Sequence, residues 1–322
     1  MKNSIGILLF LVCSATTTIF AQSMHQNGSG YVPQRVYDSK EKKYSDFEAM
    51  LSELAQAEIV FVGEQHDDPA THRLERAILE GLARRQRPVI LALEMFERDV
   101  QKTLDDYLAG KLTEEEFLKA SRPWPRYATD YRPLIEMAKA HNWGVVAGNV
   151  PRRYAAQVSR SGLAALDGLP AEERKMIAAQ NQCPQDDYFK RFAEAMTQHP
   201  GADKDKKQPT KEEQEKERAM VEKFYRAQCV KDETMAESIA AAYQAVSAPK
   251  PVIVHYNGAF HSDYKLGTAA RAKQRLPKAN HKVVSIVPLD NLDTINPDEY
   301  RKRGDYIVFT IKTPKPAQTA NK

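Results

Sequence analysis

Residues 58–69 read EIVFVGEQHDDP, and this stretch is the clearest indication of the fold because it joins a strand, a turn and the start of a helix without interruption. The apolar, largely β-branched run from Ile59 to Val62 is typical of a buried strand. Asp68 can cap a helix, and Pro69 suits its first position. The apolar residues at positions 74, 78 and 82 then fall on one face of that helix. The stretch therefore predicts a strand that leads directly into an amphipathic helix.

Similar apolar runs recur along the chain with helical patterns between them. Further strands are expected at residues 89–93, 143–147, 252–255, 283–287 and 306–311. Helices are expected from about 100 to 142, with a break at Arg122–Pro125, and from about 160 to 247. Strands that alternate with helices indicate a mainly parallel sheet. The sequence therefore predicts one α/β domain over 22–313, with a mainly parallel central sheet flanked by helices, a helical insertion at about 160–247 and a disordered tail at 314–322.

The N-terminus has the pattern of a secretory signal peptide. Lys2 precedes a short apolar run at residues 5–12, and small and polar residues lead to Ala21. The run is too short to span a bilayer, which needs about 20 apolar residues, and no later stretch is long and apolar enough. Cys13 raises lipid attachment as an alternative, but Val12 is a poor match for the small residue that normally precedes a lipid-modified cysteine. We therefore expect cleavage after Ala21 and a periplasmic or secreted protein, in preference to a lipid anchor at Cys13.

Composition narrows the function further. The formal net charge is +4 over 322 residues, and acidic and basic residues are interspersed, which argues against a nucleic-acid-binding surface. After cleavage two cysteines remain, Cys183 and Cys229, without the CxxC spacing typical of zinc sites. In an oxidising compartment such a pair more often forms a disulfide than two buried free thiols. We therefore expect a bridge that ties the helical insertion together.

Polar side chains follow four of the predicted strands. Ligands of open α/β sheets bind beyond the carboxyl ends of the strands, and the residues found there are Glu64, His66, Glu94, Asn149, Arg152, His255 and His261. Taken singly, each is more often structural than functional, so it is the joint pattern that points to a site. Two carboxylates and two imidazoles, namely Glu64, His66, Glu94 and His261, would suffice for a divalent metal ion or for the acid–base groups of a hydrolase. The sequence contains no Gly-rich phosphate loop, Gly-x-Ser-x-Gly elbow or HExxH motif, so nucleotide binding and classical serine hydrolysis are unsupported.

An aromatic cluster surrounds the proline-rich break. Trp124, Tyr127 and Tyr131 lie there among arginines. Such a cluster is usually part of a core or an interface, but aromatic rings beside arginines would also suit a large planar anion. Both tyrosine and histidine can ligate haem iron.

Four segments together resemble the ChaN-like haem-binding uptake family, which is grouped with the Tiki/TraB proteins and the erythromycin esterases. They are Gly63–Asp67, Leu91–Met95, Gly148–Arg152 and Gly258–Asp263, and the likeness runs in order from about residue 55 to about 290. This resemblance implies an α/β fold with a helical insertion. It also implies haem binding outside the cytoplasm, by a dimer that holds haems at its interface.

The resemblance further implies roles for particular residues. Iron ligation is carried onto Tyr131, which lies where the family's tyrosine–proline motif falls, with Tyr127 as its rival. Arg152, His66 and His261 are the other residues expected to bind haem. The hydrolase relatives have acidic and histidine residues at positions that match Glu64, His66, Glu94 and His261, so a metal-dependent or acid–base hydrolase is the alternative. Haem uptake is thus the first hypothesis, hydrolysis the second and a non-catalytic scaffold the third, and whether the chain is an enzyme stays open.

Overall fold

The computed structural model describes residues 32–85, 87–197 and 210–313. The predicted signal peptide, the alternative lipid site at Cys13 and the tail at 314–322 lie outside these residues. In the described part of the chain, no helix has both the length and the apolar character needed to cross a membrane.

The centre of the fold is a mixed, mostly parallel sheet with the strand order β2-β1-β8-β7-β3-β6-β4-β5. The strands are β1 (Gln34–Asp38), β2 (Lys43–Ser45), β3 (Ile59–Glu64), β4 (Val89–Glu97), β5 (Gly144–Asn149), β6 (Val252–Gly258), β7 (His281–Leu289) and β8 (Tyr306–Ile311). Strands β3 to β8 pair in parallel, which confirms all six strands and the sheet type predicted from the sequence. Strands β1 and β2 were not predicted, and they add an antiparallel edge beyond β8. Both are short and alternate with polar residues, so they lack the apolar run that marks the central strands.

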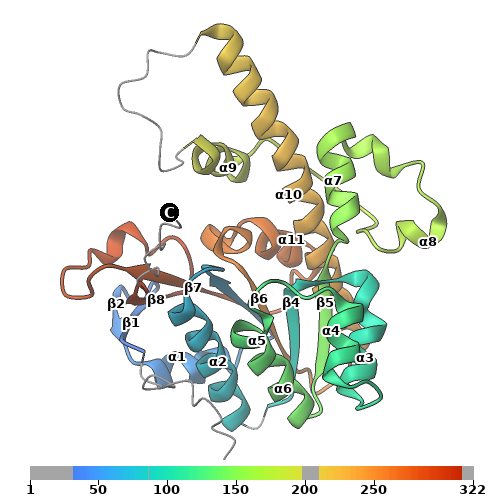
Figure 1. Cartoon of the computed structure of the whole chain (residues 1–322). Coiled ribbons are helices and arrows are strands. Elements are labelled where there is room, and N and C mark those ends of the chain that lie inside the picture. Colours follow the sequence, from blue (N-terminus) through green and yellow to red (C-terminus); the bar gives the residue numbers. More distant parts are fainter. Residues whose placement is uncertain (1–31, 86, 198–209, 314–322) are drawn as a thin grey trace, which may run out of the picture. The chain divides into compact units, whose positions relative to one another are not determined.

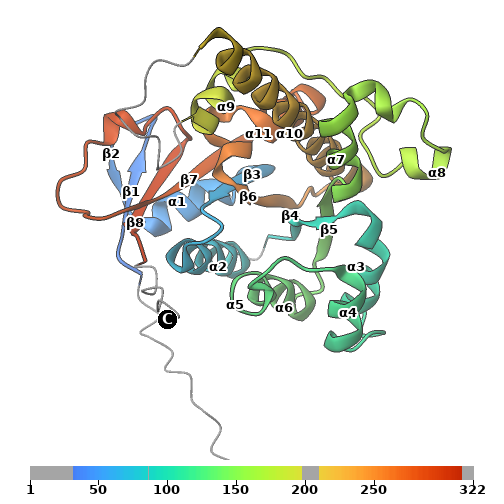
Figure 2. The same cartoon turned by 45° about the horizontal axis from the view of Figure 1, so that its top comes forward.

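Helices cover both faces of this sheet (Figures 1 and 2). Their bounds are α1 (Phe47–Leu54), α2 (Pro69–Arg84), α3 (Gln101–Leu108), α4 (Glu114–Ser121), α5 (Tyr127–Asp130), α6 (Arg132–Ala140), α7 (Arg152–Ser161), α8 (Ala171–Arg174), α9 (Asp187–Thr197), α10 (Lys211–Ala245) and α11 (Gly267–Arg275). Alternate residues of β3 show the two layers. Val60 and Val62 belong to the core under α1, α2 and α6, whereas Ile59 and Phe61 pack with residues of α10 and α11.

The predicted strand-to-helix connection after β3 is present. The side chain of Asp68 accepts hydrogen bonds from the backbone N–H groups of Ala70 and Thr71, and Pro69 is the first residue of α2. The predicted apolar face of α2 is buried against the sheet. This short connection carries the polar residues 64–67 across the end of β3.

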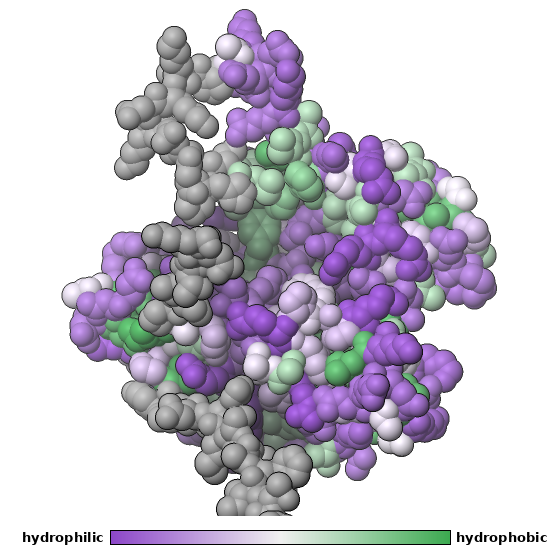
Figure 3. Space-filling model, viewed as in Figure 1, coloured by the Kyte–Doolittle hydropathy of each residue, from purple (hydrophilic) through white to green (hydrophobic). Residues whose placement is uncertain are grey.

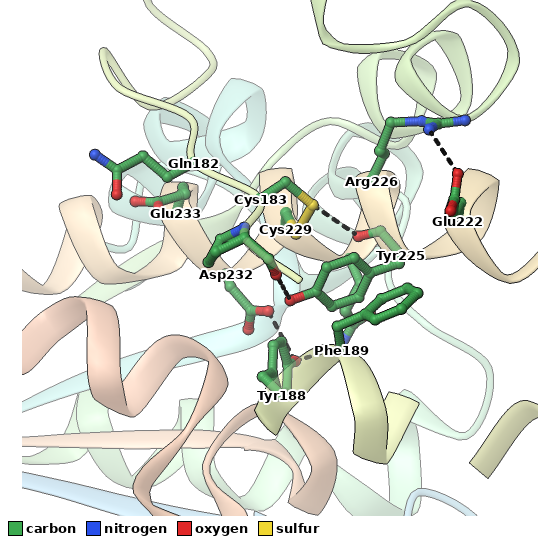
Figure 4. Close-up of a disulfide and its surroundings, with 12 residues drawn as sticks. Gln182, Cys183, Tyr188, Phe189, Glu222, Tyr225, Arg226, Cys229, Asp232 and Glu233 are labelled. Atoms are coloured by element: carbon green, nitrogen blue, oxygen red, sulfur yellow. Dashed lines mark hydrogen bonds and ion pairs between the residues drawn. A yellow bond between two sulfur atoms is a disulfide. The ribbon is translucent and has the colours of Figure 1, made fainter. Parts of the chain in front are cut away.

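The described residues of the segment between β5 and β6 form helices joined by loops, without a strand, and include the long helix α10. A disulfide joins Cys183, which precedes α9, to Cys229 on α10 (Figure 4). The predicted bridge is therefore confirmed. The rings of Tyr188 and Phe189 pack against Tyr225 beside it, so covalent and aromatic contacts together hold α9 against α10.

Candidate functional site

The carboxyl ends of β3, β4 and β6 meet at one edge of the sheet and form the floor of a cavity. Glu64 at the end of β3 pairs in register with Gly258 at the end of β6, and β4 lies on the other side of β6. The cavity has a volume of about 800 Å³, which is in the range of small-molecule and cofactor sites. Four predicted residues line it together: Glu64, His66, Glu94 and His261. Helices α9 and α10 supply much of its wall, and in Figure 3 apolar side chains gather where these helices adjoin, whereas the far end of α10 is hydrophilic.

The first of two polar clusters on this floor comprises Glu64, His66, His72, Glu75 and Tyr131, and we call it the His66 cluster. Nδ1 of His66 is hydrogen-bonded to Oε1 of Glu64, which also accepts a bond from the Tyr131 hydroxyl at 3.0 Å. Behind them, Nδ1 of His72 lies 3.3 Å from Oε2 of Glu64 and 2.9 Å from Oε2 of Glu75. Both carboxylates are fully buried, whereas the His66 side chain is 43% exposed. The cluster therefore holds His66 from behind and leaves part of its ring open to the cavity.

A glycine makes room for this imidazole. A Cβ atom at position 258 would lie only 2.7 Å from Nε2 of His66, well inside contact distance. On another side, the ring of Trp124 meets the imidazole edge-on at a centroid distance of 5.0 Å. The position of His66 thus depends on Glu64, on Trp124 and on the missing side chain of Gly258.

Burial and neighbouring charges act in opposite directions on the His66 cluster. Burial alone would raise the pKa of Glu64, but hydrogen bonds to His66 and His72 lower it. Burial would lower the pKa of His72, but Glu64 and Glu75 raise it to about 11, so His72 is charged at neutral pH. Burial and the charge of Glu64 both raise the pKa of Glu75, which favours a proton on that carboxyl.

Glu64, His72 and Glu75 are also the residues that could hold a metal ion. One donor atom from each lies within 4.8 Å of the others, and Oε1 of Glu75 is buried without a hydrogen-bond partner. Two carboxylates and an imidazole fit a small divalent cation, and a proton held on Glu75 satisfies the same group without a metal. Among the described residues this trio is the group whose donor atoms lie this close together, and it shares Glu64 with the predicted set of Glu64, His66, Glu94 and His261.

The second polar cluster comprises Glu94, Tyr188, Gln228, Asp232 and His261, and we call it the His261 cluster. Nδ1 of His261 lies 2.7 Å from Oδ1 of Asp232, and its Nε2 lies 3.3 Å from Oε1 of Glu94. The other oxygen of Asp232 accepts a hydrogen bond from the Tyr188 hydroxyl at 2.8 Å, which is drawn in Figure 4. The Gln228 amide nitrogen lies 3.1 Å from the same hydroxyl. His261 is therefore enclosed between two buried carboxylates.

This enclosure keeps His261 charged. Burial alone would lower its pKa, but the carboxylates of Glu94 and Asp232 raise it to about 9. Burial would raise the pKa of Glu94, and the charge of His261 lowers it to about 2. Glu94 also accepts a hydrogen bond from the backbone N–H of Gly258 at 2.8 Å. At neutral pH the cluster is thus an imidazolium between two carboxylates.

Aromatic and cationic side chains also line the cavity. The aromatic residues include Trp124, Phe192, Phe260 and Tyr264, and the cations are Arg191, Lys231 and Arg303. The cavity therefore combines carboxylates and imidazoles from the strand ends with aromatic and cationic side chains.

Three of the residues predicted to bind haem do not line this cavity. Tyr131 is buried behind Glu64, and burial together with that carboxylate raises its pKa far above the ordinary value. Tyr127 is buried in the main core against Phe96, and Arg152 is exposed at the first residue of α7. Of the predicted haem-binding residues, His66 and His261 are the ones that reach the cavity wall.

Several residues of the site were not identified from the sequence. Asp232, Tyr188 and Lys231 come from the helical insertion, and His72 and Glu75 come from α2. A usable signal existed in each helix. Glu75 lies one turn before Ile78 on the buried face of α2, and Asp232 lies one turn after Cys229 on α10. A carboxylate on the apolar face of a helix needs a partner, and here the partners are the two histidine clusters.

Comparison with known proteins agrees with this architecture. The family model described as haem-binding uptake, Tiki superfamily, ChaN matches residues 50–272 of the chain. Among solved structures, ChaN of Campylobacter jejuni, described as binding haem cofacially, superposes with a TM-score of 0.61 at 16% identity, over 86% of this chain and 96% of that one. At this identity the superposition shows the fold.

Two further matches are weaker. An erythromycin esterase mutant in its open conformation aligns with a TM-score of 0.43 and 13% identity, over 89% of this chain and 85% of that one. The chloroplastic protein RETICULATA-RELATED 5 of Arabidopsis thaliana is 26% identical over 162 residues, which are 45% of this chain. The match covers 21% of that protein, so the chain corresponds to about a fifth of its length.

Proposed function

The chain belongs to the ChaN family of haem-binding uptake proteins in the Tiki superfamily, and from this premise we propose that it binds haem in the cavity at the strand ends and serves haem uptake outside the cytoplasm. The observation that carries the proposal is the cavity itself. It combines aromatic walls, cationic side chains and a partly exposed imidazole in a volume of about 800 Å³. These are the features that a flat, apolar and anionic metalloporphyrin requires.

His66 is the iron ligand that the geometry favours. Its Nδ1 atom is bonded to the buried carboxylate of Glu64, and such a carboxylate–histidine pair orients an imidazole and increases its basicity toward a metal. Its side chain is 43% exposed, whereas the His261 side chain is 6% exposed and has a carboxylate at each nitrogen. Tyr131, the ligand implied by the family resemblance, would have to give up its hydrogen bond to Glu64 and reach past that residue.

The exported location is supported by the disulfide. A bridge between Cys183 and Cys229 persists in an oxidising compartment and is rare in the cytosol. The Campylobacter jejuni relative is described as binding haem cofacially, and we extend this to a dimer in which two copies bring two haems together. Light scattering with and without haemin tests the dimer, which is contradicted by a monomeric mass in both states.

The first experiment is a visible-absorption titration with haemin of protein that begins at Gln22. We expect a saturable spectrum for the wild-type protein and for His141→Ala, which removes an exposed histidine distant from the cavity. His66→Ala should lose the imidazole-bound spectrum and weaken binding. If Tyr131 is the ligand, Tyr131→Phe will instead lose a tyrosinate charge-transfer band while His66→Ala keeps it. A flat wild-type titration would rule out haem binding.

One observation favours hydrolysis as a second candidate function. Haem binding alone has no need for two buried carboxylate–imidazole clusters side by side, whereas general acid–base catalysis uses this arrangement. The test is a panel of ester and amide substrates with the wild type, His66→Ala and Glu94→Gln. Turnover that both substitutions abolish would support an enzyme, and no turnover on any substrate would count against it.

A further inference from the structure

Two cations line the cavity without a carboxylate partner. Of the three cations there, Arg303 lies 3.4 Å from Asp263. Lys231 on α10 and Arg191 on α9 form no ion pair with any carboxylate of the described residues. Arg191 instead lies over the ring of Tyr264, with its guanidinium carbon 3.4 Å from the ring centroid. Both side chains are half-buried, so each loses part of its hydration without gaining an ion pair.

The acidic residues on the floor act on Lys231 only at a distance, because its charge helps to lower the pKa of Glu94 without an ion pair between the two groups. Glu94 forms an ion pair with His261 and accepts a hydrogen bond from the backbone N–H of Gly258. Glu64 is occupied by His66, His72 and Tyr131. Both floor carboxylates thus already have bonded partners, and neither forms an ion pair with Lys231.

Lys231 lines the same cavity as the aromatic residues. It follows Gln228 by one helical turn, and both residues line the cavity from α10. Phe260 and Trp124 line the same cavity from the segment after β6 and from the α4–α5 connection. A flat ligand held between the aromatic walls would therefore lie within reach of a cation at its edge.

We propose that Lys231, assisted by Arg191, binds the carboxylate groups of the porphyrin, so that the cavity selects haem through its propionates as well as through its iron. This inference rests on the proposed haem-binding function and adds the group that distinguishes haem from its esterified form. Loss of a charge-assisted hydrogen bond should weaken binding by about 10-fold or more, because such bonds are worth roughly 1.5–3 kcal/mol. The half-buried position of Lys231 places the expected effect near the lower end of that range.

The experiment compares haemin with haemin dimethyl ester, which keeps the ring and the iron but has no carboxylate. We expect the wild type to bind haemin on the order of 10-fold more tightly than the ester. Lys231→Ala should weaken haemin binding by a similar factor and leave ester binding within about 2-fold, and Lys231→Arg should restore the preference. Lys223→Ala is the matched control, because Lys223 lies on the same helix, is exposed and does not line the cavity.

The outcomes separate this inference from the proposed function. A wild type that binds both compounds equally, or a Lys231→Ala variant that weakens both equally, overturns carboxylate recognition and leaves haem binding intact. A wild type that binds neither overturns haem binding and the inference with it. Should Lys231→Ala misfold by circular dichroism, Lys231→Gln replaces it as the charge-removing variant.

Discussion

The His66 cluster and the His261 cluster begin from the same local pattern and reach different environments. Each histidine is the fourth residue of a Gly-x-x-His segment after a buried strand, and each bonds a buried carboxylate through Nδ1. Yet the His66 side chain is 43% exposed and the His261 side chain is 6% exposed. The difference arises because α10 places Asp232 and Gln228 around His261. A helix from the insertion thus turns one of two similar imidazoles into an enclosed ion pair and leaves the other available to a ligand.

The two clusters also differ in which atoms of the histidine are bonded. In the His66 cluster, residues of α2 stand behind the imidazole and leave its front open. In the His261 cluster, carboxylates from β4 and α10 occupy both nitrogens. The first arrangement suits ligand binding, and the second ties the insertion to the sheet.

Removing Asp232 should have the largest effect, because it disrupts the His261 cluster and leaves the His66 cluster in place. Asp232→Ala leaves His261 with one carboxylate and takes the acceptor from the Tyr188 and Thr268 hydroxyls. Loss of one partner of a buried pair typically costs about 3–5 kcal/mol, and we expect a drop of that size in the free energy of unfolding measured in urea. Asp187→Ala, at an exposed carboxylate of α9, should change it by less than about 0.5 kcal/mol. A loss below about 1 kcal/mol for Asp232→Ala would show that the ion pair does not tie the insertion to the sheet.

Removing the disulfide tests whether the insertion acts on His261 alone. The bridge closes a segment of 46 residues next to the His261 cluster. A Cys183→Ala/Cys229→Ala variant should lose about 2–4 kcal/mol of stability, because its unfolded chain is less constrained. Amide hydrogen exchange should rise in α9 and the adjoining part of α10 and stay unchanged in α2, which carries the support of His66. Equal increases in both regions would contradict the separation of the two clusters.

Raising the pH should weaken the His261 cluster. The folded pKa of His261, raised to about 9, lies above the ordinary value of 6.5. Its contribution is therefore fully present below about pH 6.5 and is lost as the pH rises through about 9. The loss is on the order of 3 kcal/mol, and urea unfolding at a series of pH values measures it. His261→Gln should flatten the slope over this window, and an unchanged slope in that variant would assign the effect to another group.

Filling the space at position 258 should displace the imidazole of His66. Gly258→Ala places a methyl group 2.7 Å from Nε2 of His66, and overpacking of this kind costs about 1–3 kcal/mol. We expect weaker haemin binding with an altered spectrum, because the imidazole has to move while Glu64 holds its other side. Gly168→Ala is the control, since nothing lies within 4 Å of a Cβ atom there. Unchanged haemin binding in Gly258→Ala would exclude His66 as the iron ligand.

Sequence reasoning located the residues of the floor but not their partners. Glu64, His66, Glu94 and His261 were predicted together because parallel strands bring their carboxyl ends to one edge of the sheet, and all four line the cavity. Tyr131 was assigned to the site by resemblance, and packing places its hydroxyl behind Glu64, 67 residues away in sequence. Lys231 and Asp232 gave only a weak signal, since a charged residue on a helix is usually exposed.

The features that could be predicted from the sequence are those that depend on residues close together along the chain. The β-branched runs specify the six central strands, and Asp68 with Pro69 specifies the start of α2, because burial period and capping act over a few residues. Which side chains share the cavity depends on how distant elements pack together. The bond between Gly258 and Glu94 spans 164 residues of sequence, and that between His261 and Asp232 spans 29. Such contacts follow from how α10 packs across the sheet, and no local pattern encodes the angle and register of that packing.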